Sequence, residues 1–305
     1  MLIKPADDKS KRVQLLESLQ SSPNLDASQK KWAREELFNL QRGIQGERDA
    51  AHYIDAYFAP SKNHVVIHDL RLVVDDEVTQ IDHLLIDRTM EFFLLETKCF
   101  NGNIKINEQG EFSVTYSGQR TFGVPSPIEQ SKRHERALRK VLEWLGISGR
   151  LPTATPFRHA VLMHPEATIS RPPAKSFDTS MVIKADQFHD WHNKAVDRTS
   201  VLATVVGAAN FRSTETLKDW GEQIARRHKP EDLLWLPDFM KPKQRPEPPA
   251  PSPSKPDSST ATPERKLICA TCGEKITFPE GKFCWNNERR FGGKQYCRTH
   301  QAAFK

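Results

Sequence analysis

Hydrophobic and polar positions at the start of the chain favour helices. Residues 9–42 form two polar stretches punctuated by Leu, as expected of helices that expose most of their surface. The sequence Gly-Ile-Gln-Gly at 43–46 is expected to break this pattern. After it, ERDAAHYIDAYF shows an amphipathic helix pattern that runs through residue 58.

Stretches rich in β-branched and aromatic residues follow, flanked by Gly and Asn, and they predict strands. They cover residues 64–74, 79–87, 90–100, 102–107 and 111–116. Further along the chain, 157–164 and 180–185 have the same character, and helices are expected to fill 186–228.

A helix is predicted over residues 128–146, because Leu138, Val141, Leu142 and Leu145 form an apolar stripe at helical spacing. The rest of its surface is basic, with Lys132, Arg133, Arg136, Arg139 and Lys140. Such a charge run is either a solvated face or a surface that contacts phosphate groups. Together these elements predict an α/β or α+β domain of roughly 200 residues.

The end of the chain differs in composition. Residues 241–264 hold eight prolines and no aromatic residue, which predicts an extended linker. From 265 to 305 there are nine Lys or Arg and three Glu, so the whole formal charge of +6 resides there. This excess indicates an anionic partner or merely a solvated tail. With the elements above, this composition predicts four parts: 1–42, an N-terminal helical segment; 43–240, a folded domain; 241–264, a linker; and 265–305, a small Cys-rich module.

Composition excludes some classes of protein. The chain is 37% hydrophobic and 28% charged, and no apolar run approaches 18 residues, so we expect no membrane span and no membrane partner. The sequence MLIKPADDKSKR lacks the apolar region of a secretion signal. Four of the five cysteines crowd into the last 40 residues, a spacing typical of metal binding in a reducing compartment. The expected location is the cytoplasm.

Three charges interrupt the apolar stretch TQIDHLLIDRTMEFFLLETKCF at 79–100. Glu96 and Lys98 are two residues apart and share one face of a strand. Asp82, on the preceding strand, falls opposite Glu96 if the hairpin loop is the odd-length Arg88-Thr89-Met90. A two-residue turn would instead pair Asp82 with Leu95. An arrangement with Asp82, Glu96 and Lys98 on one face of the sheet therefore requires the odd-length loop or a bulge.

Ionised groups rarely enter a core unless they are paired or bind a metal. Two converging carboxylates suit Mg²⁺ or Mn²⁺, and a lysine beside the metal can hold an attacking water and stabilise phosphate charge. These parts suit phosphodiester hydrolysis. The alternative is that Asp82 and Lys98 form a structural ion pair near a strand end.

Four blocks in order resemble the NERD (nuclease-related) domain family: GIQGERDAAHYIDAYF, QIDHLLI, FFLLETKCFNGNI and PSPIEQSKRHERALRKVL. The resemblance covers roughly residues 43–145. NERD domains are placed in the PD-(D/E)xK superfamily, so it implies a restriction-endonuclease-like mixed central sheet flanked by helices, with a divalent metal at the strand pair.

The resemblance also implies roles for single residues. Asp82 and Glu96 match the acidic metal ligands, and Lys98 matches the catalytic lysine. Glu47 matches an acidic residue of the first helix that completes the metal site; alternatively, the helix dipole alone favours it there. Gln130 matches a glutamine that orients a phosphate or the lysine, or it is an ordinary first-turn residue. Cys99-Phe100 intervenes where the family often has Asn or an aromatic residue.

The last 40 residues contain two metal-binding half-sites. Cys269 and Cys272 form a C-x2-C pair, and Cys297 and His300 form a C-x2-H pair after 24 intervening residues. Four such ligands predict a structural zinc site in a zinc-ribbon-like module. Cys284 is an alternative to His300 as fourth ligand. The aromatic residues Phe283, Trp285, Phe291 and Tyr296 are either a base-stacking surface or the small core of the module.

Two functional hypotheses follow. The first is a metal-dependent nuclease acting on nucleic acid, DNA rather than RNA, with a zinc module that aids binding. The second is a non-catalytic nucleic-acid or protein interaction protein built on a nuclease-like scaffold. Retention of both acids and the lysine favours the first hypothesis.

Overall fold

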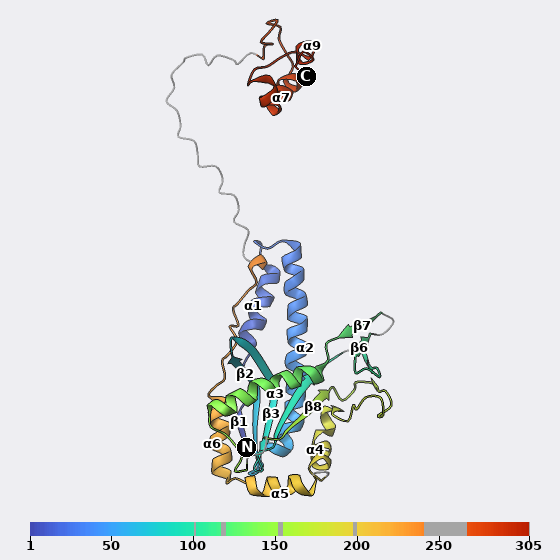
Figure 1. Ribbon diagram of the computed structural model, residues 1–305, viewed down its shortest axis with the longest axis vertical. Coiled ribbons are helices and arrows are strands. Elements are labelled where there is room, and N and C mark those ends of the chain that lie inside the picture. The colour runs from blue at the N-terminus through green and yellow to red at the C-terminus, as the bar shows by residue number, and fades with distance from the viewer. Residues whose placement is uncertain (101, 117–119, 152–154, 198–199, 241–266, 305) are drawn as a thin grey trace. The chain divides into compact units, whose positions relative to one another are not determined.

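A computed structural model of the chain describes residues 1–100, 102–116, 120–151, 155–197, 200–240 and 267–304. The chain divides into two compact units, Met1–Lys243 and Gln244–Lys305 (Figure 1). Residues 1–42 belong to the first unit, together with the predicted nuclease-like region. The whole of the predicted linker and the first two residues of the predicted zinc module lie outside the described residues.

A six-stranded mixed sheet forms the centre of the first unit, with the strand order β1-β2-β3-β4-β8-β10. Its strands are β1 (Leu2–Lys4), β2 (His64–Val74), β3 (Glu77–Asp87), β4 (Phe92–Lys98), β8 (Phe157–Met163) and β10 (Val182–Lys184). β3 pairs antiparallel with both β2 and β4, whereas β1 is parallel to β2 and β8 is parallel to β4 and β10. The predicted mixed sheet is confirmed, and β1 is an addition that the sequence did not predict.

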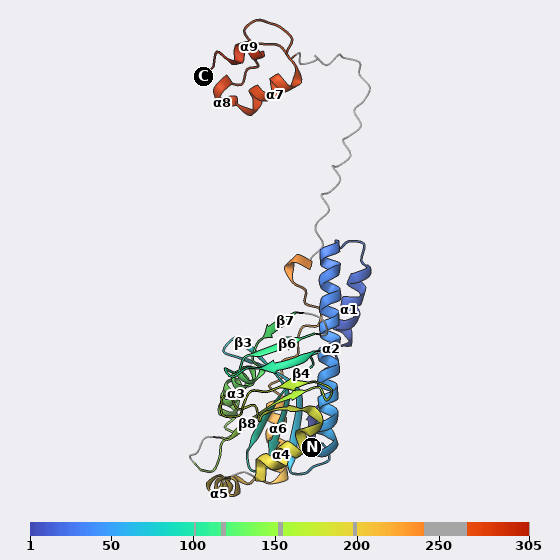
Figure 2. The same cartoon turned by 90° about the vertical axis from the view of Figure 1, so that its right-hand side faces the viewer.

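Helices cover both faces of this sheet, as Figure 2 shows for α2 and α3. The helices of the unit are α1 (Ser10–Ser21), α2 (Ala27–Phe58), α3 (Pro127–Trp144), α4 (Phe188–Asp197), α5 (Val201–Asn210) and α6 (Thr214–Ala225). On β4, Leu94 packs in a cluster with residues of α3 and α6, while Phe93 packs with residues of α2 and α4. Because successive side chains of a strand point to opposite faces, covering both faces requires the nearly unbroken apolar runs seen in the sequence.

A second, four-stranded sheet adjoins the first unit's core, with the order β7-β6-β5-β9. Its strands are β5 (Asn103–Ile106), β6 (Phe112–Thr115), β7 (Thr121–Val124) and β9 (Ile169–Ser170). β5 and β6 correspond to the predicted strands at 102–107 and 111–116, while β7 and β9 are additions. Inward-facing Ile104, Phe112 and Val114 are fully or almost fully buried against β8 and β10 residues.

The predicted break at 43–46 is wrong, because α2 continues through it as one helix. Gly46 is needed there for close packing: a Cβ at this position would lie 2.7 Å from Cβ of Cys99. Gly43 has no neighbour within 4 Å of its would-be Cβ. Each glycine costs a helix about 1 kcal/mol relative to alanine, and burial of Ala50, Ile54 and Phe58 on the same helix offsets that cost.

The second unit is built from short helices: α7 (Phe278–Asn286), α8 (Glu288–Phe291) and α9 (Arg298–Gln301). Its small core contains Ile276, Cys284, Phe291 and Tyr296. A core of this size rarely stabilises a domain without a metal or a disulfide, and all five cysteines of the chain are free.

Candidate functional site

The hairpin between β3 and β4 closes through a three-residue loop, as required to place Asp82 on the same face as Glu96 and Lys98. The Asp87 amide donates to the carbonyl of Glu91 at 3.1 Å, which leaves Arg88, Thr89 and Met90 as the loop. Met90 adopts φ 67°, the left-handed conformation that such loops use in their last position. The pairing His83↔Leu95, with Leu84↔Leu94 beyond it, places Asp82 opposite Glu96 at the next position.

A cavity of about 470 Å³ lies at this strand pair, and all five residues singled out from the sequence line it. α2 contributes Glu47, β3 contributes Asp82, β4 contributes Glu96 and Lys98, and α3 contributes Gln130. Residues that are separated by more than 80 positions in the chain therefore meet at one cavity. The sheet brings the acids and the lysine together, and the two helices on its opposite faces add the remaining two groups.

Glu96 is the most deeply buried acid of the site, with 1% of its surface exposed. Its Oε1 accepts a hydrogen bond from Nζ of Lys98 at 2.7 Å, and its Oε2 lies 3.3 Å from Nδ1 of His134 on α3. Lys98 thus pairs with Glu96, not with Asp82 as in the structural alternative. His134 was missed by sequence analysis, although it lies one helical turn after Gln130 and so shares its helix face.

Asp82 is held by the backbone of the neighbouring strand, since the Thr97 amide donates to its Oδ2 at 2.8 Å. Burial raises the pKa of Asp82 well above its usual value, and the nearby Glu96 and Glu47 raise it further. Two opposing carboxylates in one cavity repel each other unless a cation lies between them. The site therefore has the electrostatic character of a cation site with oxygen ligands.

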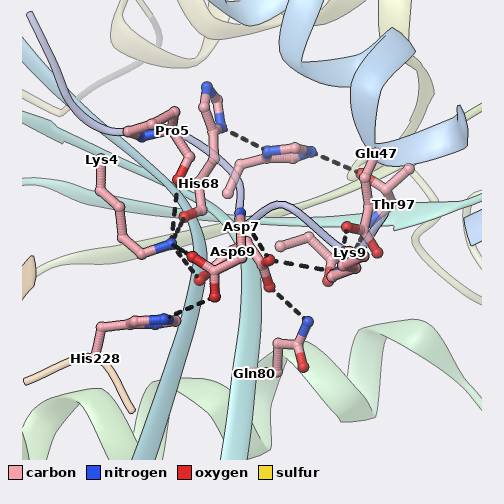
Figure 3. Close-up of polar contacts among 12 residues, drawn as sticks. Lys4, Pro5, Asp7, Lys9, Glu47, His68, Asp69, Gln80, Thr97 and His228 are labelled. Atoms are coloured by element: carbon pink, nitrogen blue, oxygen red, sulfur yellow. Dashed lines mark hydrogen bonds and ion pairs between the residues drawn. The ribbon is translucent and has the colours of Figure 1, made fainter. Parts of the chain in front are cut away.

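Glu47 has a cationic partner that no motif indicated. Its Oε2 lies 3.2 Å from Nζ of Lys9, which comes from the segment before α1 (Figure 3). Burial raises the pKa of Glu47, and Lys9 partly opposes that effect, while Asp69 and Glu96 add to it. Burial lowers the pKa of Lys9, but Glu47 and Asp69 together raise it above its usual value. Both side chains are held by their mutual attraction.

A buried histidine pair lies behind the site. His83 Nε2 is 3.0 Å from Oγ1 of Thr97, and its Nδ1 is 2.7 Å from Nδ1 of His68, which in turn contacts Asp55. Burial lowers the pKa of His83 well below its usual value. His83 therefore faces away from Asp82, as alternation along a strand requires, and supports the strand pair from the other face.

Gln130 lies between two cavities. Besides lining the one described above, it lines a neighbouring cavity of about 520 Å³ together with Arg133, Arg136 and Lys140 of α3. Lys132, Arg139 and Lys140 are engaged with Glu129, Glu135 and Asp75, respectively. Arg133 and Arg136 are thus the cations of this helix that best extend the acidic site toward an anionic ligand.

The second unit gathers the predicted zinc ligands. One ligand atom from each of Cys269, Cys272, Cys297 and His300 lies within 4.8 Å of the others. Burial raises the pKa of Cys269, but the backbone amides of Cys297, Cys272 and Thr271 lower it to about 6. The backbone of Glu274 lowers the pKa of Cys272, but burial and the side chains of Cys269 and Cys297 raise it to about 11, so Cys269 is the favoured thiolate of this pair. These soft and borderline donors fit zinc.

Cys284 lies outside this ligand cluster. It is buried in the module's core, where its Sγ accepts a hydrogen bond from the Tyr296 amide at 3.4 Å. The structure therefore favours His300 as the fourth ligand. Of the aromatic residues considered above, Phe291 and Tyr296 belong to the core of the module, whereas Phe283 and Trp285 are about half exposed.

Comparison with known families agrees with this geometry. Residues 42–164 match the family model of NERD, the nuclease-related domain. The resemblance found in the sequence blocks is thereby confirmed over residues 42–164, which lie within the first unit. A search of curated proteins gave no match, and neither did a search of solved structures. Within the described residues, no helix is both long and apolar enough to cross a membrane.

Proposed function

We propose that this protein is a divalent-metal-dependent nuclease that hydrolyses phosphodiester bonds in DNA. The observation that carries the proposal is the convergence of Asp82, Glu96 and Lys98 on one cavity, with Glu47 and Gln130 beside them. A nuclease-related domain match over the same residues supports it.

The donor set fits Mg²⁺ or Mn²⁺. Asp82 and Glu96 would hold the ion, and Glu47 would complete its oxygen ligands. Burial raises the pKa of Asp82, and repulsion from Glu96 and Glu47 raises it further. A bound cation would relieve that repulsion, which supports this assignment. Such an ion supplies Lewis-acid activation of a phosphate and lowers the pKa of a bound water.

The chain's own residues would orient the reacting groups. Lys98 keeps its ammonium beside the site because Glu96 accepts its hydrogen bond at 2.7 Å. From that position it would stabilise the charge that develops on the phosphate and hold an attacking water. His134 supports Glu96 from α3, and Gln130 would bind a phosphate oxygen at the boundary with the arginine-lined cavity.

Nucleic acid would enter along α3. Arg133 and Arg136 line the cavity that continues from the site, and guanidinium groups suit phosphate recognition. The zinc module would add affinity through exposed Phe283 and Trp285, which can stack on bases, and through its net positive charge. A structural Zn²⁺ held by reduced thiols also suits a cytoplasmic protein.

The test is cleavage of plasmid, linear duplex, single-stranded DNA and RNA with Mg²⁺, Mn²⁺ or EDTA. Wild type is compared with Lys98→Ala and with Lys31→Ala, a control in which the lysine is 70% exposed and pairs with Glu35. We expect metal-dependent cleavage of DNA that falls by about 100-fold or more in Lys98→Ala alone. Binding without cleavage by wild type on every substrate would instead support the non-catalytic interaction protein.

A further inference from the structure

Lys9 enters the candidate active site from outside the nuclease-related region. It precedes α1, more than 30 residues before the start of the family match at residue 42. Its Nζ lies 3.2 Å from Oε2 of Glu47 and 3.4 Å from Oδ2 of Asp69, so the ammonium bridges two carboxylates (Figure 3). Only 13% of the Lys9 side chain is exposed. A lysine is rarely buried to this extent unless it is paired.

The position of Lys9 is unfavourable for local structure. Lys9 is the N-cap residue of α1, where Ser, Thr, Asp and Asn are preferred, and its side chain makes no capping hydrogen bond. A cation at the N-terminus of a helix also opposes the positive end of the helix dipole. Local structure therefore gives no reason for a lysine here, whereas the two carboxylates at its other end do.

Asp69 is unfavourable locally as well. It has φ 52° inside strand β2, a left-handed conformation that costs a non-glycine residue about 1–3 kcal/mol. The pairs His68↔His83 and Leu70↔Ile81 bracket it, so Asp69 stands beside Asp82 in the β2–β3 register. Two locally costly residues thus meet in one contact at the edge of the site, which is typical of functional positions.

The carboxylate of Asp69 binds Lys9 and the N-terminal segment that precedes α1. Its Oδ1 accepts a hydrogen bond from Gln80 at 2.7 Å, and its Oδ2 accepts one from the Asp7 amide at 3.2 Å in addition to the contact with Lys9. Asp69 therefore serves as an anchor for this segment, and it does not line the cavity that Glu47, Asp82 and Glu96 share.

Further contacts fix the segment that carries Lys9. Nζ of Lys4 donates to the backbone carbonyls of His68 and Asp69 at 3.1 and 3.0 Å. Asp7 Oδ2 lies 2.8 Å from Nε2 of His228, which follows α6. Figure 3 shows these groups converging from β2, from the N-terminal segment and from the chain after α6. These contacts fix the backbone of the segment that carries Lys9, and the two carboxylates fix its ammonium.

We propose that Lys9 is a positioning residue of the active site, which holds Glu47 by one oxygen and so directs the other toward the site of Asp82 and Glu96. Within the described residues, the hydrogen bond to the Glu47 carboxylate uses Oε2 alone, which leaves Oε1 for a ligand. Without the ammonium, Glu47 and Asp69 would repel each other, and Glu47 would turn away. The inference rests on the proposed function, because it gives Lys9 a role through a metal-binding carboxylate.

The test is a double-mutant cycle read out by Mn²⁺ affinity, measured by calorimetry on the full chain, and by cleavage rate. The variants are Lys9→Met, Glu47→Gln and the double variant, with Lys11→Met as control because Lys11 is exposed and lies two residues away. We expect Lys9→Met and Glu47→Gln each to weaken Mn²⁺ binding about 10-fold or more, as removal of supporting groups at metal sites does. The double variant should be no weaker than Glu47→Gln, because Lys9 acts through Glu47. Lys9→Arg should recover most of the loss, since it keeps the cation.

If the pair of Lys9 and Glu47 were merely structural, Lys9→Met would lower thermal stability, but the effects of the two substitutions on Mn²⁺ affinity would not be non-additive. If Lys9→Met reduces the folded fraction, Lys9→Gln, which keeps a donor to Glu47 without the charge, replaces it in the cycle. Wild-type affinity in Lys9→Met, or losses that multiply in the double variant, would overturn the inference while leaving the nuclease proposal intact. A wild-type protein that neither binds Mn²⁺ nor cleaves any substrate would overturn the proposed function and the inference with it.

Discussion

Asp82 lies directly opposite Glu96 on the neighbouring antiparallel strand, because the β3–β4 hairpin closes with three residues. A loop shorter by one residue would send the two carboxylates to opposite faces of the sheet. The same register places the backbone amide of Thr97 at 2.8 Å from Oδ2 of Asp82. The hairpin loop thus decides whether a two-carboxylate site exists at all.

Asp82→Asn should stabilise the metal-free protein at neutral pH. Burial, with Glu96 and Glu47, raises the folded-state pKa of Asp82 above its unfolded value. The folded state therefore binds the proton more tightly, so this group's stabilisation is complete below about pH 4 and is lost as pH rises through the folded pKa. In EDTA, the variant should melt above wild type at pH 7.5, and the difference should shrink toward pH 4.

Added Mg²⁺ should raise the melting temperature of wild type and leave that of Asp82→Asn nearly unchanged. Glu108→Gln, which alters an exposed acid, serves as the control. If the melting temperatures of Asp82→Asn and wild type in EDTA differed equally at pH 7.5 and pH 4, the predicted pH dependence would be contradicted.

Arg133→Ala and Arg136→Ala should each weaken DNA binding and lower its salt dependence. Both residues line the cavity next to Gln130. Each lost phosphate contact should reduce the slope of log K against log salt by about 0.9 for a duplex. The measurement is fluorescence anisotropy over a salt series with a labelled duplex.

Arg139→Ala is the matched control on the same helix. Its guanidinium contacts Glu135 at 2.6 Å and lies over the ring of Phe157 at 4.3 Å, so it already has protein partners. A slope change in Arg139→Ala equal to that in Arg133→Ala would argue against a specific path along α3.

Alanine substitutions should distinguish the two glycines of α2. In Gly46→Ala the new Cβ would lie 2.7 Å from Cβ of Cys99, so we expect a loss of about 1–3 kcal/mol in the free energy of unfolding from overpacking. Gly43→Ala adds a methyl group in open space and should gain about 0.5–1 kcal/mol from helix propensity. Urea unfolding of both variants measures these changes in the free energy of unfolding. Stabilisation of both variants would show that the Cys99 side chain moves away from the new methyl group at little cost.

Zinc content should depend on Cys272 but not on Cys284. Cys272 belongs to the four-residue cluster, whereas Cys284 packs in the core of the module. We expect one zinc per chain by elemental analysis, its loss in Cys272→Ser and its retention in Cys284→Ala. Structural zinc supplies about 10–16 kcal/mol of binding free energy in small modules, so Cys272→Ser should also unfold the second unit. Loss of zinc in Cys284→Ala would make Cys284 a ligand.

The sequence by itself determined the parts of the protein that depend on short-range spacing. Side chains alternate along a strand, so the positions of Asp82, Glu96 and Lys98 defined one face and required an odd-length loop. The C-x2-C and C-x2-H pairs likewise indicated two metal-binding half-sites, because each pair is local, whereas the choice of His300 over Cys284 needed the structure. Most strands and helices followed from periodicity for the same reason.

Only the tertiary structure decided what depends on packing between distant segments. Gly43 and Gly46 indicated a helix break, but α2 continues through both, because burial of other residues of this helix offsets the cost of its glycines. Local spacing carries no information on which strand a helix approaches, so the contact of His134 with Glu96 could not be predicted. The role of Lys9 depends most strongly on the tertiary structure. Its neighbours in the chain indicate an ordinary helix start, but its ammonium contacts Glu47 and Asp69, which lie 38 and 60 positions away. The folding of α2 and β2 brings these two carboxylates to it.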